Sequence, residues 1–231
     1  MLKRGAIWLR DFRQTKAFDL LAASPLIVWF LFGLREQAPL TGLRLTELLG
    51  GTVNLLDFLQ LIALIGSFFL TFLLIYLLII RKTPELRSRG ALPRAVAVCG
   101  TFIANGFLYL KAVPLSLPVQ ALADLLIIGS TIGSLVSVSR LGASYSLMPE
   151  ARALVTTGPY ALIRHPLYLA ENIGTLGLML QFQQPWASLL GVASILVQYW
   201  RTIFEETVLL EAYPDYSTYR AHTWRFLPYV F

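Results

Sequence analysis

The chain has 231 residues, of which 56% are hydrophobic and only 14% charged, and its mean hydropathy is +0.65. This composition is too apolar for an ordinary soluble domain and indicates an integral membrane protein. The net charge of +6 is spread over segments that flank apolar stretches, so it favours contact with anionic membrane lipids and argues against nucleic-acid binding.

Six apolar stretches qualify as membrane spans, because a helix of about 20 apolar residues crosses the bilayer core. In chain order they cover residues 18–34, 53–80, 95–112, 119–139, 166–182 and 186–203, with approximate boundaries. The sequence therefore predicts an all-α fold, a polytopic membrane helix bundle with about six transmembrane helices and a cytosolic C-terminal helix.

Basic residues set the expected orientation of these spans. The N-terminal arm carries Lys3, Arg4, Arg10, Arg13 and Lys16, and the connection between the second and third spans carries Arg81, Lys82, Arg87, Arg89 and Arg94. Six alternating spans place 16 of the 19 basic residues on one side and leave Arg35, Arg44 and Lys111 on the other. Because cytosolic flanks are enriched in Lys and Arg, we expect a multi-pass protein with both termini in the cytosol.

Two polar segments, at about 140–165 and 204–231, are predicted to lie together on the cytosolic side. We accordingly divide the chain into N-terminal transmembrane helices (1–139) and a C-terminal part with a helical hairpin and cytosolic tail (140–231). The chain has a single cysteine, Cys99, and two histidines, His165 and His222. These numbers argue against a cysteine or histidine metal site, and we predict no metal.

The first polar segment ends in Gly-Pro-Tyr-Ala-Leu-Ile-Arg-His-Pro-Leu-Tyr (158–168). Gly158 and Pro159 predict a stiff turn, and Pro166 fits the first position of a helix, where a missing N–H costs nothing. The helix start that follows Arg164 and His165 offers free amides to an anion. The plainer interpretation is a capped span whose arginine contacts lipid phosphates.

Acidic residues inside apolar stretches are the next candidates for function, because an intramembrane carboxylate is costly. Glu171 shares a helix face with Tyr168 and lies about one and a half turns into its span. Asp57 lies near the outer interface and is better explained structurally, whereas for Asp124 a structural and a functional interpretation are equally supported.

The last span ends in a second charged motif, Arg201 followed by Glu205 and Glu206. Arg201 and Glu205 are spaced to pair across one helical turn, which on its own indicates a solvated helix end. Successive residues on a helix point about 100° apart, so at most one glutamate of the pair faces a given site.

Together these motifs resemble the isoprenylcysteine carboxyl methyltransferase superfamily, which includes phospholipid N-methyltransferases. The resemblance covers about residues 140–228 and rests on Leu-Val-Thr-x-Gly-Pro-Tyr, Arg-His-Pro-x-Tyr, Arg-x-x-x-Glu-Glu-x-x-Leu, Tyr-x-x-Tyr and a closing Arg-Phe-Leu-Pro. It implies an integral membrane methyltransferase that uses S-adenosyl-L-methionine at the cytosolic membrane face, with the N-terminal helices (1–139) on the substrate side and residues 140–231 as the cofactor-binding core. The implied cofactor-binding residues are Val155, Gly158, Pro159, Tyr160, Arg164, His165, Pro166, Tyr168, Glu205 and Glu206.

Two residues are candidates for the transfer step itself. Arg201 is suited to orient a carboxylate or thiolate acceptor, whereas Glu171 is suited to take a proton from an amine or hydroxyl acceptor. The acceptor is expected to be a lipid or a small apolar molecule that undergoes O-, N- or S-methylation. Two other functions stay open: a reductase of the sterol-reductase type that uses NADPH, and a non-catalytic membrane scaffold or small transporter.

Overall fold

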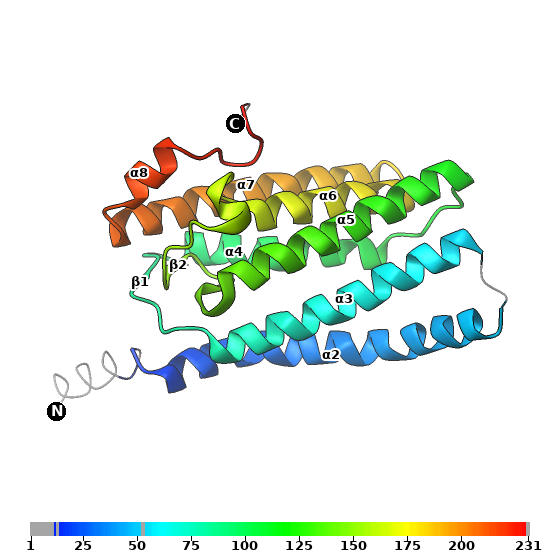
Figure 1. Cartoon of the computed structure of the whole chain (residues 1–231), viewed down its shortest axis with the longest axis horizontal. Coiled ribbons are helices and arrows are strands. Elements are labelled where there is room, and N and C mark those ends of the chain that lie inside the picture. Colours follow the sequence, from blue (N-terminus) through cyan, green and yellow to red (C-terminus); the bar gives the residue numbers. More distant parts are fainter. Residues whose placement is uncertain (1–11, 13, 52–53, 230–231) are drawn as a thin grey trace.

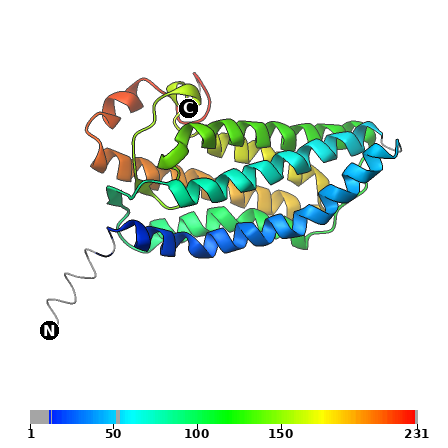
Figure 2. The same cartoon turned by 60° about the horizontal axis from the view of Figure 1, so that its bottom comes forward.

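The computed structural model describes residues 12, 14–51 and 54–229, and its long helices run side by side as one elongated bundle (Figures 1 and 2). In chain order the elements are α2 (Lys16–Leu49), α3 (Leu55–Ile80), β1 (Leu86–Arg87), α4 (Leu92–Phe102), the 3-10 helix η1 (Ile103–Tyr109), α5 (Leu117–Leu141), η2 (Gly142–Ser144), β2 (Glu150–Ala151), η3 (Gly158–Ala161), α6 (Pro166–Gln181), α7 (Trp186–Ala212) and α8 (Tyr216–Ala221). Four residues of the expected basic arm, Lys3, Arg4, Arg10 and Arg13, lie outside the described residues.

The all-α prediction is confirmed, and five helices are long and apolar enough to cross a membrane. They span Lys16–Leu49, Leu55–Ile80, Leu92–Tyr109, Leu117–Ser144 and Trp186–Ala212. The sixth predicted span corresponds to α6, whose 16 residues cover only about 24 Å at 1.5 Å per residue. That length falls short of a bilayer core of about 30 Å, although α6 packs along α5 and α7 inside the bundle.

Local sequence explains where two of these helices begin. Asn54 caps α3 by accepting hydrogen bonds from the amides of Leu56 and Asp57, and the Asp57 carboxylate accepts in return from the Asn54 amide. This reciprocal capping box gives Asp57 a structural role, in agreement with the plainer interpretation. Pro166 occupies the first turn of α6, as its position in the sequence predicts.

Helices α5 and α6 approach each other closely because small residues face each other between them. A Cβ on Gly177 would lie 2.8 Å from the Ala123 carbonyl oxygen, and one on Gly133 would lie 3.0 Å from the Ala170 Cβ. Close backbone approach through small residues is a common way for membrane helices to associate. The contact fixes α6, which carries Tyr168 and Glu171, against the long helix α5.

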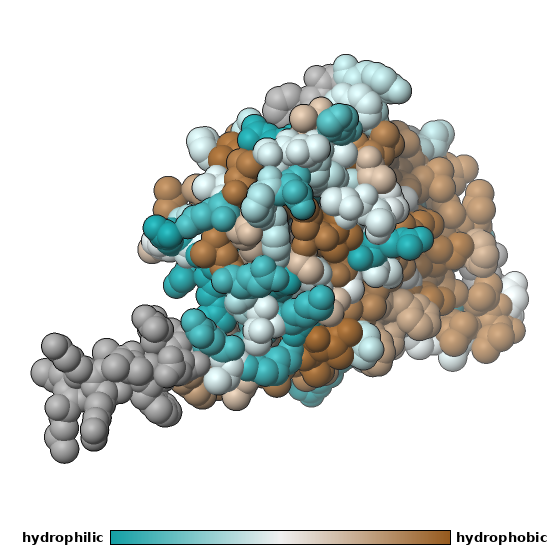
Figure 3. Space-filling model, turned by 60° about the vertical axis from the view of Figure 1, so that its left-hand side comes forward, coloured by the Kyte–Doolittle hydropathy of each residue, from teal (hydrophilic) through white to brown (hydrophobic). Residues whose placement is uncertain are grey.

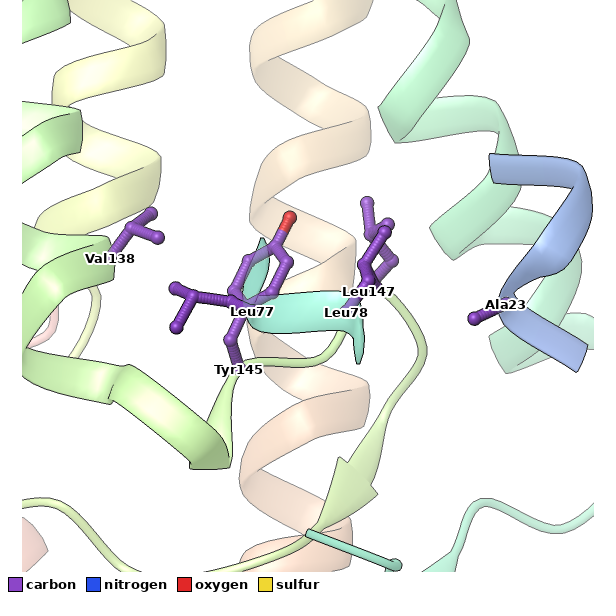
Figure 4. Close-up of a cluster of buried hydrophobic side chains, with 6 residues drawn as sticks. All are labelled: Ala23, Leu77, Leu78, Val138, Tyr145 and Leu147. Carbon is purple, nitrogen blue, oxygen red and sulfur yellow. The ribbon is translucent and has the colours of Figure 1, made fainter. Parts of the chain in front are cut away.

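A segment between α5 and β2 turns back into the bundle and closes it at one end. Tyr145 and Leu147 from this segment pack with Ala23, Leu77, Leu78 and Val138 in a buried hydrophobic cluster (Figure 4). The cluster joins α2, α3 and α5 to the segment, so the polar chain beyond α5 is anchored on the apolar helices.

Hydrophilic residues gather over the same end of the molecule, while the visible shaft of the bundle is hydrophobic (Figure 3). We call this the polar end; it comprises the first turn of α2, residues 81–91, residues 142–165 and residues 204–229. At its centre the buried Asp19 carboxylate binds Arg81 Nε at 2.8 Å and Arg152 Nη2 at 2.7 Å. Strand β1 pairs antiparallel with β2, so residues far apart in the chain are tied together here.

Candidate functional site

A cavity of about 110 Å³ lies in the polar end, and we call it the polar-end cavity. Among the residues in its wall are six of the predicted cofactor-binding residues: Val155, Tyr160, Arg164, His165, Tyr168 and Glu205. These come from the loop before η3, from η3, from the start of α6 and from the end of α7. The two polar segments predicted to lie on one side therefore do meet, and the motifs converge on a single cavity.

Three further predicted residues shape this region from outside the lining. Gly158 adopts a φ of +63°, a conformation that favours glycine, and its backbone packs against the Arg140 side chain. Pro159 opens η3 and Pro166 opens α6, so both set the direction of the chain around the cavity.

Glu206 faces away from the polar-end cavity and forms the centre of an ion cluster. Glu206 is 2% exposed, and its carboxylate accepts from Arg164 Nε at 2.9 Å and from Arg225 Nη2 at 2.9 Å. The ring Nε2 of His165 lies 3.1 Å from the same carboxylate. Glu206 thus ties the end of α7 to the start of α6 and to the C-terminal tail, which also pairs in parallel with residue Ile163 through Trp224.

Glu205, by contrast, points into the polar-end cavity, as expected when adjacent helical residues diverge. Its carboxylate accepts a hydrogen bond from the Tyr168 hydroxyl, and the Tyr168 ring stacks on the His165 ring with centroids 5.7 Å apart. The Arg201 guanidinium lies 4.7 Å from the centroid of the Tyr168 ring. Arg201 is therefore directed at Tyr168 and, within the described residues, forms no ion pair with Glu205.

Three polar atoms around the polar-end cavity are buried and have no hydrogen-bond partner within the described part of the chain. They are the Tyr160 hydroxyl, the Tyr216 hydroxyl and Arg152 Nε. Burial raises the pKa of both phenols well above the usual range, so both keep their protons at neutral pH. Unpaired buried donors are costly, and a polar ligand in the cavity would satisfy them.

A second and larger cavity, of about 430 Å³, lies inside the helix bundle, and we call it the bundle chamber. Both predicted transfer residues, Glu171 and Arg201, line this chamber rather than the polar-end cavity. Between them lies Gln198, whose side-chain amide donates to Glu171 and whose carbonyl oxygen accepts from Arg201 Nη1 at 2.9 Å. Arg201 Nη2 also donates to the Leu147 carbonyl oxygen at 3.2 Å.

The two cavities are separated by the segment that turns back into the bundle. Ser144, Ser146 and Met148 line the polar-end cavity, whereas Tyr145 and Leu147 line the bundle chamber. Residues 144–148 thus alternate between the two cavities, so a single stretch of chain forms part of both walls. Leu167 of α6 lines both cavities, which marks the place where they come closest.

Residues 119–216 match the family described as phospholipid methyltransferase. This part of the chain is similar to that family. The resemblance inferred from the motifs is thereby confirmed, and together with the apolar helices it supports an integral membrane protein. The match begins within α5, ahead of the expected boundary at residue 140.

Two curated relatives are similar over part of the chain. One is the cobalt-zinc-cadmium resistance protein CzcN of Cupriavidus metallidurans, 34% identical over 45% of this chain and 49% of its own length. The other is the nickel-cobalt-cadmium resistance protein NccN of Alcaligenes xylosoxydans xylosoxydans, 32% identical over 46% of this chain and 51% of its own length. The chain thus spans about half the length of these relatives.

Within the described residues, no group of three His, Cys, Asp or Glu side chains is placed to hold a metal ion.

Several residues of both cavities were not singled out from the sequence. Gln198 lies one turn before Arg201 on an apolar helix, and its polarity there was a usable signal. Arg152 is an ordinary polar residue of a loop, and nothing in its local sequence indicates burial. Its position depends on the contact with Asp19, which only the folded chain reveals.

Proposed function

We propose that this protein transfers a methyl group from S-adenosyl-L-methionine, bound in the polar-end cavity, to an acceptor held in the bundle chamber. The observation that carries the proposal is the convergence of the family motifs on one cavity that is separated by a thin wall from a second. A water-soluble cofactor and a membrane-borne acceptor then reach the wall from opposite sides. A non-catalytic scaffold does not account for the paired cavities, and the family match favours a methyltransferase over a reductase.

The polar-end cavity has groups suited to each part of the cofactor. The carboxylate of S-adenosyl-L-methionine would lie near the positively charged Arg152 and Arg164. The hydroxyl and amino groups of the cofactor would donate to the Glu205 carboxylate. The unpaired hydroxyls of Tyr160 and Tyr216 supply further hydrogen bonds. The chemistry of the donor set therefore fits the cofactor.

When bound, the cofactor supplies an activated methyl group on a sulfonium, whose positive charge is lost during transfer. The aromatic ring of Tyr168, held by Glu205 and by stacking on His165, is suited to lie against a cation. Beyond this, the chain must align the reactants and exclude water. Alignment of this kind lowers the activation barrier by several kcal/mol. Glu171 then accepts a proton from a protic acceptor, or Arg201 orients an anionic one.

The proposal includes an orientation with the polar end and both termini in the cytosol. Lys16, Arg81 and Arg164 lie at the polar end, whereas Arg35 and Arg44 lie toward the middle and the far end of α2. Lys and Arg are enriched on cytosolic flanks, which supports this orientation.

Calorimetric titration of the purified protein with S-adenosylhomocysteine tests cofactor use, with NADPH as the parallel ligand. We expect micromolar binding of S-adenosylhomocysteine, weakened at least tenfold in Glu205→Gln. Glu211→Gln is the matched control, because Glu211 lies on the same helix but forms only an exposed pair with Arg89. Binding of NADPH alone would support the reductase, and no binding of either ligand by folded protein would support the scaffold.

A further inference from the structure

The first turn of α2 is joined to the wall of the polar-end cavity by a buried ion cluster. Arg152 belongs to that wall, and its side chain is fully buried. Both terminal nitrogens of its guanidinium contact the Asp19 carboxylate, with Nη2 at 2.7 Å from Oδ1 and Nη1 at 3.3 Å from Oδ2. Asp19 is itself only 1% exposed. A contact at two points fixes the plane of the guanidinium as well as its position.

Arg81, the residue that follows α3, holds Asp19 from the other side. Its Nε donates to Asp19 Oδ2 at 2.8 Å, and its Nη2 donates to Oδ1 at 3.1 Å and to the Asp19 carbonyl oxygen at 3.2 Å. The next carbonyl oxygen along the chain, that of Lys82, accepts from Arg152 Nη1. Strand β1 then pairs with β2 directly before Arg152. The guanidinium is therefore held from α2, from the end of α3 and from its own strand.

One donor of the Arg152 guanidinium is left over. The hydrogen bonds to its neighbours come from Nη1 and Nη2, and Nε is buried without a partner within the described residues. Arg164, the other arginine of the cavity wall, donates from Nε to Glu206 and from Nη1 to two backbone carbonyl oxygens. Leaving a buried donor unpaired is costly. Arg152 thus has the unmet donor that an acceptor group of a ligand would satisfy.

The cluster around Arg152 also has excess positive charge. Three arginines and two acidic residues make it up: Arg81, Arg87, Arg152, Asp19 and Glu150. One positive charge is therefore not balanced among these five groups. A carboxylate in the adjoining cavity would balance it and accept from Arg152 Nε, because carboxylate and guanidinium match in charge and in planar geometry.

We propose that Arg152 binds the carboxylate in the amino acid portion of the cofactor, and that Asp19 and Arg81 are the positioning residues that present Arg152 to the cavity. The inference rests on the proposed methyltransferase function. Asp19 and Arg81 lie outside residues 119–216, the part of the chain that matches the methyltransferase family. The N-terminal helices, expected to serve the acceptor, then also complete the cofactor site.

Calorimetric titration with two ligands separates recognition of the carboxylate from a general loss of structure. S-adenosylhomocysteine has the amino acid portion, whereas 5′-methylthioadenosine has the same nucleoside and sulfur without it. We expect the parent protein to bind S-adenosylhomocysteine more tightly by about thirtyfold or more, as hydrogen bonds to charged groups warrant.

Two substitutions should lower this preference by about tenfold or more, while the affinity for 5′-methylthioadenosine changes less than about threefold. Arg152→Lys keeps the charge but removes the Nε donor and the planar fork. Asp19→Asn leaves Arg152 unchanged but places an amide donor against its guanidinium, so the guanidinium loses its orientation. Should Asp19→Asn fail to fold, Arg81→Gln replaces it, with an expected fall of about threefold or more, because Asp19 then loses its second support.

Asp57→Asn and Arg89→Gln are the matched controls. Asp57 caps the start of α3, one helix length from the polar end, and Arg89 forms an exposed pair with Glu211. Both should keep the preference of the parent. A parent without this preference, or a smaller fall in the folded variants, would overturn the inference while cofactor binding itself stands. If the folded parent binds neither ligand, the proposed function fails and the inference with it.

Discussion

Glu206 and Glu205 are adjacent in sequence, yet the structure predicts opposite consequences when each is replaced by glutamine. Glu206 is the buried centre of a cluster with Arg164, Arg225 and His165, whereas Glu205 lines the polar-end cavity and accepts from one tyrosine. Glu206→Gln keeps the shape of the side chain but removes the negative charge that Arg164 and Arg225 contact. We therefore expect Glu206→Gln to reduce stability and Glu205→Gln to reduce cofactor binding.

The size of the stability loss follows from the contacts of the cluster. Removing one partner of a buried ion pair costs about 3–5 kcal/mol. The lower end applies here, because Arg164 keeps backbone acceptors at Arg220 and Thr223. A loss of about 3 kcal/mol corresponds to a fall of about 6–12 °C in the melting temperature of a chain of this size. Glu205→Gln retains an acceptor for Tyr168 and should cost about 1 kcal/mol or less.

Thermal unfolding of the detergent-purified variants, followed by circular dichroism without ligand, measures both effects side by side. The affinity for S-adenosylhomocysteine is then measured well below the melting temperature of either variant. Equal melting temperatures for the two variants would refute the ion-cluster assignment of Glu206. Unchanged affinity in Glu205→Gln would refute the assignment of Glu205 to the cofactor.

Two further predictions concern packing and pH. A Cβ on Gly100 would overlap with Cδ of Arg201, so Gly100→Ala should lower turnover in a radiometric assay at least tenfold with little change in cofactor affinity. Gly129→Ala is the control: a Cβ there has no neighbour within 4 Å, so turnover and cofactor affinity should both stay unchanged. The Tyr219 hydroxyl donates to the Tyr160 carbonyl oxygen at 2.6 Å, and burial raises the pKa of Tyr219 to about 12. Because this folded pKa exceeds the ordinary value of 10, the stabilisation is complete below pH 10 and is lost as the pH rises through 12. Melting curves between pH 9 and 12 should therefore fall less steeply in Tyr219→Phe than in the parent, and identical slopes would refute this.

Hydropathy located the helices in the sequence but not their ends. Helix α2 was expected to end near residue 34 and continues to Leu49, about 51 Å in length, which exceeds the bilayer core. Charged residues such as Arg35 and Glu36 interrupt an apolar stretch without interrupting a helix, because both favour helical conformation. Composition therefore predicts where the apolar stretch ends, whereas the helix itself continues until Gly50.

The site was predictable to the extent that its residues lie in local motifs. The turn at Gly158 and the helix start at Pro166 follow from backbone preferences that act over a few residues. The contact between Asp19 and Arg152 joins positions 133 residues apart, and no local preference indicates it. The same holds for the separation of Glu171 and Arg201, which depends on how α6 and α7 are rotated against each other.

The closeness of the two cavities is what connects this fold to the proposed methyl transfer. Reacting atoms must approach to about 3–3.5 Å along one line, so under this proposal the two cavities must open into each other when both ligands are bound. They come closest where Leu167 lines both cavities, next to the contact of Tyr168 with Arg201. The close packing of α5 against α6 holds this wall in place, and the motif at the start of α6 supplies its side chains. We therefore expect substitutions along this wall to impair transfer more than they impair the binding of either ligand.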